Sequence, residues 1–302
     1  MAGTLGLVYV ISLFVFLIAV LVYWVRVRRD VRGVTRYGIT AGLLWVGLEV
    51  LVLVTSRALI PLETVLFADA IGFLRITAFT IVGIHACRRL GIPSLPLIGV
   101  RPVPVEPVAE QQPLSDEEVF QPIGEAPPLS EPPTTVEIPA PGSELRVRLG
   151  PWLATVLAVA AGAIAYSALL FAVTSPRLSE AAKVLFGESV PRTTEISLVA
   201  ILMVIQYAFA EEIVFRLGIQ NLLSRLFRGR VRGTWIAILL TAALWTIGHA
   251  GLIEPDWVKL AQIFPIGIAL GWMLLRLGAE SCIATHVLFN LVMLFLAPTL
   301  MR

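Results

Sequence analysis

The sequence LVAILMVIQYAFAEEIVFR, residues 198–216, places two adjacent carboxylates and an arginine at the end of a long apolar run. On a helix that turns about 100° per residue, Glu212 and Arg216 lie one turn apart and can pair, whereas Glu211 points away from the arginine. A charge inside a bilayer costs at least about 2.5 kcal/mol on insertion scales, so an unpaired carboxylate there is a functional candidate. The stretch therefore predicts a membrane-spanning helix in which Glu211 acts as a base.

The composition of the whole chain agrees with a membrane protein. Of its 302 residues, 57% are hydrophobic and only 15% are charged, which fits no ordinary soluble class. Repeated apolar runs of about twenty residues predict an all-α, polytopic membrane helix bundle with about eight transmembrane helices. The net charge of +2 is too small to indicate a nucleic-acid partner, and Cys87 and Cys282 match no zinc spacing.

Arginine clusters orient the expected spans. The spans cover approximately residues 5–25, 38–60, 64–86 and 151–174, a fifth that begins near residue 194 and runs into Arg225, and then residues 234–253, 257–277 and 281–300. Arginines follow the first, third and fifth of these spans and precede the fourth. Because positive charge favours the cytoplasmic side, we expect a multi-pass protein of the cell (plasma) membrane with these ends inside.

The chain divides into three parts. Residues 1–90 form an N-terminal module of three spans, residues 91–149 a linker, and residues 150–302 a five-span catalytic domain. The linker is rich in proline and glutamate, and residues 104–144 hold nine acidic residues and no basic one. Such a segment buries too little apolar surface to offset its chain entropy, so we expect a disordered cytoplasmic linker. It is either a spacer or a docking strip for a basic partner.

Two charges of opposite sign fall inside the N-terminal module. Glu49 and Arg75 each lie about eleven residues from the cytoplasmic end of their span, so both are roughly 16 Å deep. Their matching depth predicts an ion pair between the second and third helices.

The C-terminal half carries a small set of further polar groups inside apolar runs. His249 follows Trp245 by four residues, and Asn290 follows His286 by four, so each pair shares a helix face. Counting residues from the cytoplasmic turn near residue 229 puts Glu211 and His249 level, roughly 26 Å from it. His286 is only about six residues into the last span. All three meet only if the hairpin between the fifth and sixth spans protrudes into the cytosol by about 10 Å or more.

A carboxylate and two histidines suit two kinds of hydrolysis. In the first, Glu211, His249 and His286 hold zinc, which lowers the pKa of a bound water. In the second no cofactor is needed: Glu211 takes a proton from water with help from His249, while His286 and Asn290 stabilise the oxyanion. The residues alone leave both mechanisms open.

The ordered motifs Glu211-Glu212-x-x-x-Arg216, Trp245-x-x-x-His249 and His286-x-x-x-Asn290 resemble the CAAX prenyl protease and bacteriocin-processing family of intramembrane proteases, also called CPBP or Abi. The resemblance covers about residues 194–298. It implies that Glu211, His249, His286 and Asn290 are catalytic and that Glu212 and Arg216 brace the motif helix. At Trp245 the family usually has phenylalanine, which puts the shape of the substrate cavity in doubt.

The resemblance implies an intramembrane endopeptidase, of the metalloprotease or the glutamate type, that hydrolyses membrane-embedded or lipid-anchored peptide substrates. The expected cavity lies among the fifth, sixth and eighth spans, toward the cytoplasmic side. The alternative is a non-catalytic membrane adaptor or immunity protein that uses the same fold.

Overall fold

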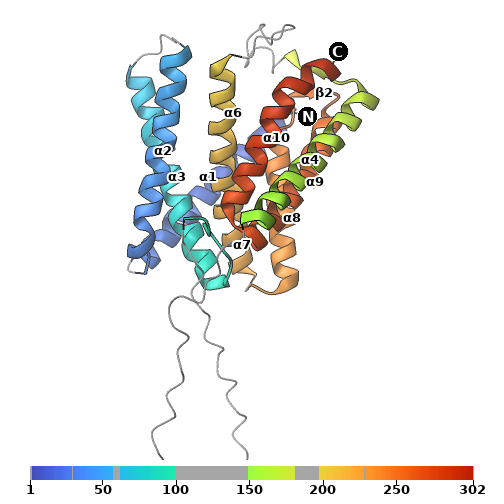
Figure 1. Cartoon of the computed structure of the whole chain (residues 1–302). Helices are drawn as coiled ribbons and strands as arrows, with labels where there is room; N and C mark the ends of the chain where they lie inside the picture. The colour runs from blue at the N-terminus through green and yellow to red at the C-terminus, as the bar shows by residue number, and fades with distance from the viewer. Residues whose placement is uncertain are drawn as a thin grey trace, which may run out of the picture.

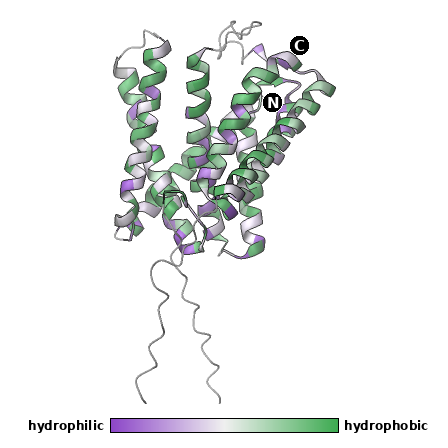
Figure 2. Ribbon diagram, viewed as in Figure 1, coloured by the Kyte–Doolittle hydropathy of each residue, from purple (hydrophilic) through white to green (hydrophobic). Residues whose placement is uncertain are grey.

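The computed structural model describes residues 2–28, 30–56, 62–98, 149–180, 197–227 and 229–301, and it is an all-α membrane bundle as predicted. Figure 1 shows the helices running between two ends of the molecule. The helices are α1 (Ala2–Val27), α2 (Arg32–Ser56), α3 (Leu62–Leu90), α4 (Leu149–Thr174), α6 (Leu198–Glu211), the π-helix η2 (Glu212–Gln220), α7 (Asn221–Leu226), α8 (Val231–Ile247), α9 (Asp256–Leu277) and α10 (Ala279–Leu300). Large apolar side chains remain exposed on the bundle, where lipid would cover them. Figure 2 shows that hydrophobic residues predominate along the helices.

Within the part of the chain that is described, seven helical rods are long and apolar enough to cross a membrane. One of them is the continuous rod formed by α6, η2 and α7. The sixth expected span is the exception, because α8 has 17 residues and ends at Ile247, six residues earlier than predicted. His249 therefore lies in a turn after α8 rather than on the helix. Non-helical backbone is tolerated at membrane depth where protein surrounds it.

A small sheet holds the connection from α8 to α9. Strand β1 (Arg177–Leu178) follows α4 and pairs antiparallel with β2 (Ile253–Glu254). The side chains of Arg177 and Glu254 also form an exposed ion pair, with Nε and Oε2 3.2 Å apart. This sheet ties the chain just beyond His249 to the end of α4.

Helices α2 and α3 form a hairpin with close backbone contact. Gly38 and Gly42 of α2 leave no room for a side chain, because an added Cβ would lie 2.4 Å from Ile81 and 2.3 Å from the Thr77 hydroxyl. Small residues four apart are a common means of helix packing in membranes. The predicted ion pair between the two helices is wrong, since Glu49 accepts a hydrogen bond from Gln206 of α6 instead.

Arg75, the expected partner of Glu49, lies over an aromatic ring. Its guanidinium carbon is 5.5 Å from the centroid of Trp45 on α2. The depth argument placed both charges at a similar level, but a level does not fix which way each side chain turns around its helix.

Helix α3 packs directly on the motif helix η2. A Cβ on Gly83 would lie 2.3 Å from the backbone oxygen of Leu217, and a Cβ on Gly218 would lie 2.2 Å from the ring of Phe79. The two glycines thus let the backbones of α3 and η2 approach closely. This contact joins the first three helices to the part of the chain that carries the polar motifs.

The segment at the start of the predicted linker is described by the structure and contacts α10. Residues 92–98 dock on the start of α10, where Glu280 accepts hydrogen bonds from the backbone N–H groups of Leu97 and Ile98 at 2.7 and 3.0 Å. The backbone oxygen of Ser94 accepts a further bond from the N–H of Ala279 at 2.8 Å, and Leu95 is buried. The first residues of the predicted linker, up to Ile98, therefore pack against the bundle. The rest of the predicted linker, residues 99–148, lies outside the described residues.

Candidate functional site

The motif helix changes its winding at the two glutamates. The rod is α-helical to Glu211 and becomes a π-helix from Glu212 to Gln220, every residue of which is buried. A π-helix bonds each N–H to the carbonyl five residues earlier and is frequent at functional sites. The side-chain amide of Asn221 donates to the carbonyls of Arg216 and Leu217 at 3.3 and 2.8 Å, which helps to satisfy this looser backbone.

Glu212 is fully buried and contacts two partners. Its Oε2 lies 3.5 Å from Nε of Arg216, which is also fully buried, so the expected pair is present. Its Oε1 lies 2.8 Å from Nδ1 of His286 on α10. The carboxylate of Glu212 thus offsets the arginine and orients the histidine. The sequence analysis did not anticipate the second contact.

Glu211 faces the other side of the same histidine. Its Oε2 accepts a hydrogen bond of 2.6 Å from the indole N–H of Trp245 on α8 and lies 3.9 Å from Nε2 of His286. The side chain of Glu211 keeps 27% of its surface exposed, whereas Glu212 keeps none. Glu211 is therefore the carboxylate that water can reach.

Trp245 is the centre about which the site is packed. Its ring lies 5.1 Å from the ring of His249 and 5.3 Å from that of His286, both edge to face, and the Arg216 guanidinium carbon stacks over it at 4.6 Å. Gly267 of α9 gives the ring room, because a Cβ there would lie 3.1 Å from it. A cation over an indole face is favourable. In this buried site the contact with Trp245 and the ion pair with Glu212 together stabilise the charge of Arg216.

His249 is held by the end of α8. Its Nδ1 lies 2.9 Å from the backbone oxygen of Trp245, and its own N–H bonds to the oxygen of Thr246. Burial lowers the pKa of His249 below its usual value, and the Glu211 carboxylate opposes this shift. The imidazole is thereby kept neutral near pH 7, with Nδ1 bound and Nε2 free to act as an acceptor.

Asn290 lies one turn after His286 on α10 and is half-buried. Among the described residues its side chain has no hydrogen-bonding partner. Its place beside the other site residues thus rests on the shared helix face and not on a contact.

The hairpin between the motif rod and α8 extends beyond the start of α10, as the meeting of Glu211 with His286 requires. Glu211 is about 22 Å along its rod from the end of α7, whereas His286 is only about 10 Å from the start of α10. Because the two side chains are neighbours, the end shared by α7 and α8 must extend more than 10 Å beyond the start of α10. Figure 1 shows α8 reaching below the lower end of α10.

The proposed zinc ligands do not form a three-ligand set. In the described ranges, no three His, Cys, Asp or Glu side chains gather closely enough to hold a metal ion. Nδ1 of His286 is bonded to the carboxylate of Glu212. The ring of His249 contacts the ring of Trp245 rather than the carboxylate of Glu211. The arrangement of Glu211, His249 and His286 thus fits proton transfer better than joint coordination of zinc.

Two residues that the sequence analysis did not single out lie close to this cluster. Tyr9 of α1 stacks on Phe215 with ring centroids 6.3 Å apart and packs against Gly248, where an added Cβ would be 2.6 Å from its ring. Lys259 of α9 donates a hydrogen bond of 3.0 Å to the buried Gln262, and its charge acts on His249. The only sequence signal for Lys259 was a single cation within an apolar run.

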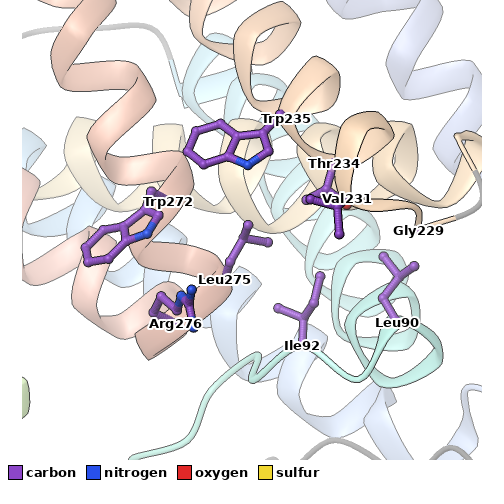
Figure 3. A pocket seen from close by; sticks show the side chains of 9 residues that line it. All are labelled: Leu90, Ile92, Gly229, Val231, Thr234, Trp235, Trp272, Leu275 and Arg276. Carbon is purple, nitrogen blue, oxygen red and sulfur yellow. The ribbon is translucent and has the colours of Figure 1, made fainter.

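A separate groove lies at the opposite end of α8 from His249. It has a volume of about 310 Å³ and is lined by Leu90, Ile92, Gly229, Val231, Thr234, Trp235, Trp272, Leu275 and Arg276 (Figure 3). Thr234 is about 20 Å along α8 from Ile247. This groove is therefore not the cavity expected among the fifth, sixth and eighth spans.

Comparison with known proteins agrees with the sequence motifs. Residues 193–292, about a third of the chain, match the family described as Rce1-like, type II CAAX prenyl endopeptidase Rce1-like. The resemblance stated from the three motifs is confirmed over this range. No curated protein and no solved structure matches the chain.

Proposed function

From the Rce1-like sequence of residues 193–292, we propose that this chain is an intramembrane endopeptidase that cuts a membrane-embedded or lipid-anchored peptide. The observation that carries the proposal is the position of His286 between two glutamates. Its Nδ1 lies 2.8 Å from Glu212 and its Nε2 lies 3.9 Å from Glu211. One carboxylate is committed to structure and the other is available for chemistry.

The two groups that face each other are both acceptors. When Nδ1–H of His286 donates to Glu212, Nε2 carries a lone pair toward the Glu211 carboxylate. The two atoms are too far apart for a direct hydrogen bond, but a water molecule can donate one proton to each. Such a water has its oxygen lone pairs directed away from both acceptors and toward a substrate carbonyl. The indole N–H of Trp245 fixes the orientation of the Glu211 carboxylate.

Hydrolysis then follows from general acid–base chemistry. The water oxygen bonds to the carbonyl carbon while its proton passes to Glu211, and the carbonyl oxygen gains the negative charge. The Asn290 amide supplies a donor for that charge, and the neutral His249 imidazole, whose Nε2 is an acceptor, assists the proton transfer. Glu211 returns the proton to the leaving nitrogen as the C–N bond breaks, which gives a carboxylic acid and an amine.

The proposed setting is the cell membrane, with the arginine-bearing helix ends in the cytosol. Arg89 pairs with Asp30 at 3.2 Å, and Arg225 donates to Tyr23, so the ends of α1, α3 and α7 lie at one end of the bundle. Positive charge favours the cytoplasmic side, which is where residues 99–148 would also lie.

The test is cleavage of a fluorogenic prenylated peptide by the purified full chain, with and without a strong chelator. We expect cleavage by the native protein and none by Glu211→Gln, with activity surviving metal removal. Cleavage by Glu211→Gln at the native rate would refute the proposal. Loss of activity on chelation, restored by zinc, would support the metal-dependent mechanism instead. An inactive but folded native protein would favour the adaptor.

A further inference from the structure

The groove at the start of α8 lies apart from the polar site and has no part in the proposed chemistry. The end of α3, the start of α8 and the end of α9 border it, and its volume is about 310 Å³. Figure 3 shows Trp272 and Arg276 on one side of the groove and Leu90 on the other, with Trp235 beside them. Apart from Arg276 and Thr234, the side chains that line the groove are aromatic or aliphatic.

Arg276 brings a positive charge to this groove. Its side chain is exposed, and it forms no ion pair within the described part of the chain. The two acidic residues described at this end of the bundle have partners elsewhere. Asp30 pairs with Arg89 at 3.2 Å, and Glu280 accepts hydrogen bonds from two backbone N–H groups at 2.7 and 3.0 Å. An anion in the groove would therefore meet a guanidinium that no described carboxylate shares.

The rim of the groove is also positively charged. Arg89 precedes the lining residue Leu90, and Arg230 and Arg232 stand on either side of the lining residue Val231. Arginines thus outnumber carboxylates around the opening. Clustered charge of one sign at a concave surface raises the local concentration of the opposite ion, so the groove favours an anionic ligand.

The groove also lies at the level where membrane meets water. Arg276 is in the last turn of α9, and both tryptophans of the groove are exposed. Tryptophan is enriched at the head-group level of a bilayer. Leu239 follows Trp235 by one turn of α8 and is exposed as well. An apolar surface therefore continues from the groove toward the middle of the membrane.

The volume of the groove limits what can enter it. Pockets for small molecules measure about 300–1,000 Å³, so 310 Å³ is at the lower end of that range. The groove has room for a head group and the first part of its chains, but not for a whole phospholipid. The rest of the acyl chains would lie against the exposed apolar face of α8.

We propose that this groove binds an anionic phospholipid of the cytoplasmic leaflet, with the phosphate on Arg276 and the acyl chains along α8. A guanidinium donates two parallel N–H bonds to a phosphate, and the hydroxyl of Thr234 offers a further donor to the head group. Basic pockets between transmembrane helices on the cytoplasmic side bind anionic head groups in this way. The leaflet follows from the proposed orientation of the arginine-bearing helix ends. The bound lipid would join the end of α3 to α8 and α9.

The experiment measures lipid binding, which is independent of cleavage. The full chain is immobilised on scintillant beads in micelles of a neutral detergent and is loaded with tritiated phosphatidylglycerol. Unlabelled phosphatidylglycerol should displace the label at a concentration at least about fivefold lower than phosphatidylcholine with the same acyl chains. Inorganic phosphate in large excess should not displace it, because free phosphate leaves the apolar lining uncovered.

Two arginine variants separate the groove from the general charge of this end. Arg276→Gln should remove most of the preference for phosphatidylglycerol. Arg232→Gln removes the same charge from the same end, but Arg232 does not line the groove, so this variant should keep most of the preference. Both side chains are exposed, so both variants should fold like the parent. Equal losses in the two variants would show a diffuse attraction to the surface and would overturn the proposal.

A third variant tests the groove without changing any charge. Thr234→Phe places a ring in the groove and should weaken the binding of phosphatidylglycerol several-fold. Unchanged binding would mean that the lipid lies elsewhere, and if this variant does not fold, Arg276→Gln at its exposed position still decides. The proposal is also overturned by a parent chain that binds no lipid saturably or that binds both lipids equally. Displacement by inorganic phosphate would assign the groove to a free anion instead of a lipid.

Discussion

Nδ1 of His286 lies 2.8 Å from Oε1 of Glu212, so the second glutamate of the pair holds the histidine that faces the first. The same carboxylate is 3.5 Å from Nε of Arg216. Glu212 therefore connects the motif helix to α10 as well as bracing the motif helix itself. Of the two adjacent glutamates, Glu212 has both of these partners, so it serves the structure and leaves Glu211 for the chemistry.

Exchanging each glutamate for glutamine should separate stability from activity. Glu212→Gln leaves the fully buried guanidinium of Arg216 without a counter-charge, so it should lower the free energy of unfolding by about 3–5 kcal/mol. Glu211→Gln keeps an acceptor for Trp245 at a partly exposed position and should cost about 1 kcal/mol or less while abolishing cleavage. Unfolding in mixed detergent micelles and peptide cleavage provide the two measurements. Equal losses of stability would contradict the assignment of roles.

The pairing of Glu212 with Arg216 was predictable because both residues are on one helix, where a spacing of four sets the geometry. The all-α bundle was predictable from apolar runs for a similar reason, since length and composition decide whether a helix can cross a bilayer. The contact between Glu212 and His286 was not, because it depends on how α10 turns its face toward η2. No residue spacing encodes that rotation.

Two expectations failed because an apolar run reveals neither the direction of a side chain nor the residue at which a helix ends. Glu49 and Arg75 have matching depths but turn toward Gln206 and Trp45. His249 was expected on a helix, but α8 ends two residues before it, which a run of apolar residues does not reveal. The apolar residues of segment 92–98 were hidden inside a proline-rich composition, although Leu95 anchors the segment against the bundle.

Trp245→Phe should slow cleavage and leave the fold intact. The change removes the 2.6 Å hydrogen bond to Glu211 and keeps an aromatic ring against Arg216 and the two histidines. A hydrogen bond to a charged group is worth about 1.5–3 kcal/mol, so kcat should fall by at least about tenfold. Trp235→Phe, on the same helix at the distant groove, is the matched control and should change neither kcat nor stability appreciably. A kcat for Trp245→Phe equal to that of the control would show that the indole N–H has no part in orienting the base.

The low pKa of His249 sets the acid limit of the reaction. Burial disfavours its charged form, so the imidazole becomes protonated only below the usual value of about 6.5. If the neutral ring assists proton transfer, kcat/KM should remain flat from pH 8 to about 6.5 and decline only at lower pH. The measurement is kcat/KM for the prenylated peptide across this range in a single detergent. An acid limb that begins above pH 6.5 would mean that a different group controls activity.

The contact between α3 and η2 predicts that the first three helices support the site sterically. A methyl group on Gly83 would lie 2.3 Å from the backbone oxygen of Leu217, and neither backbone can yield without moving the π-helix that carries Arg216. Gly83→Ala should therefore destabilise the protein by about 1–3 kcal/mol, the usual cost of overpacking, and should lower kcat by shifting the motif helix. Gly162→Ala is the matched control, because Gly162 is also inside a helical span but has nothing within 4 Å of an added Cβ. That change should be neutral or slightly stabilising, since alanine favours the helix. If both variants unfold at the same temperature and cleave at the same rate, α3 does not hold η2 in place, and the first three helices act independently of the site.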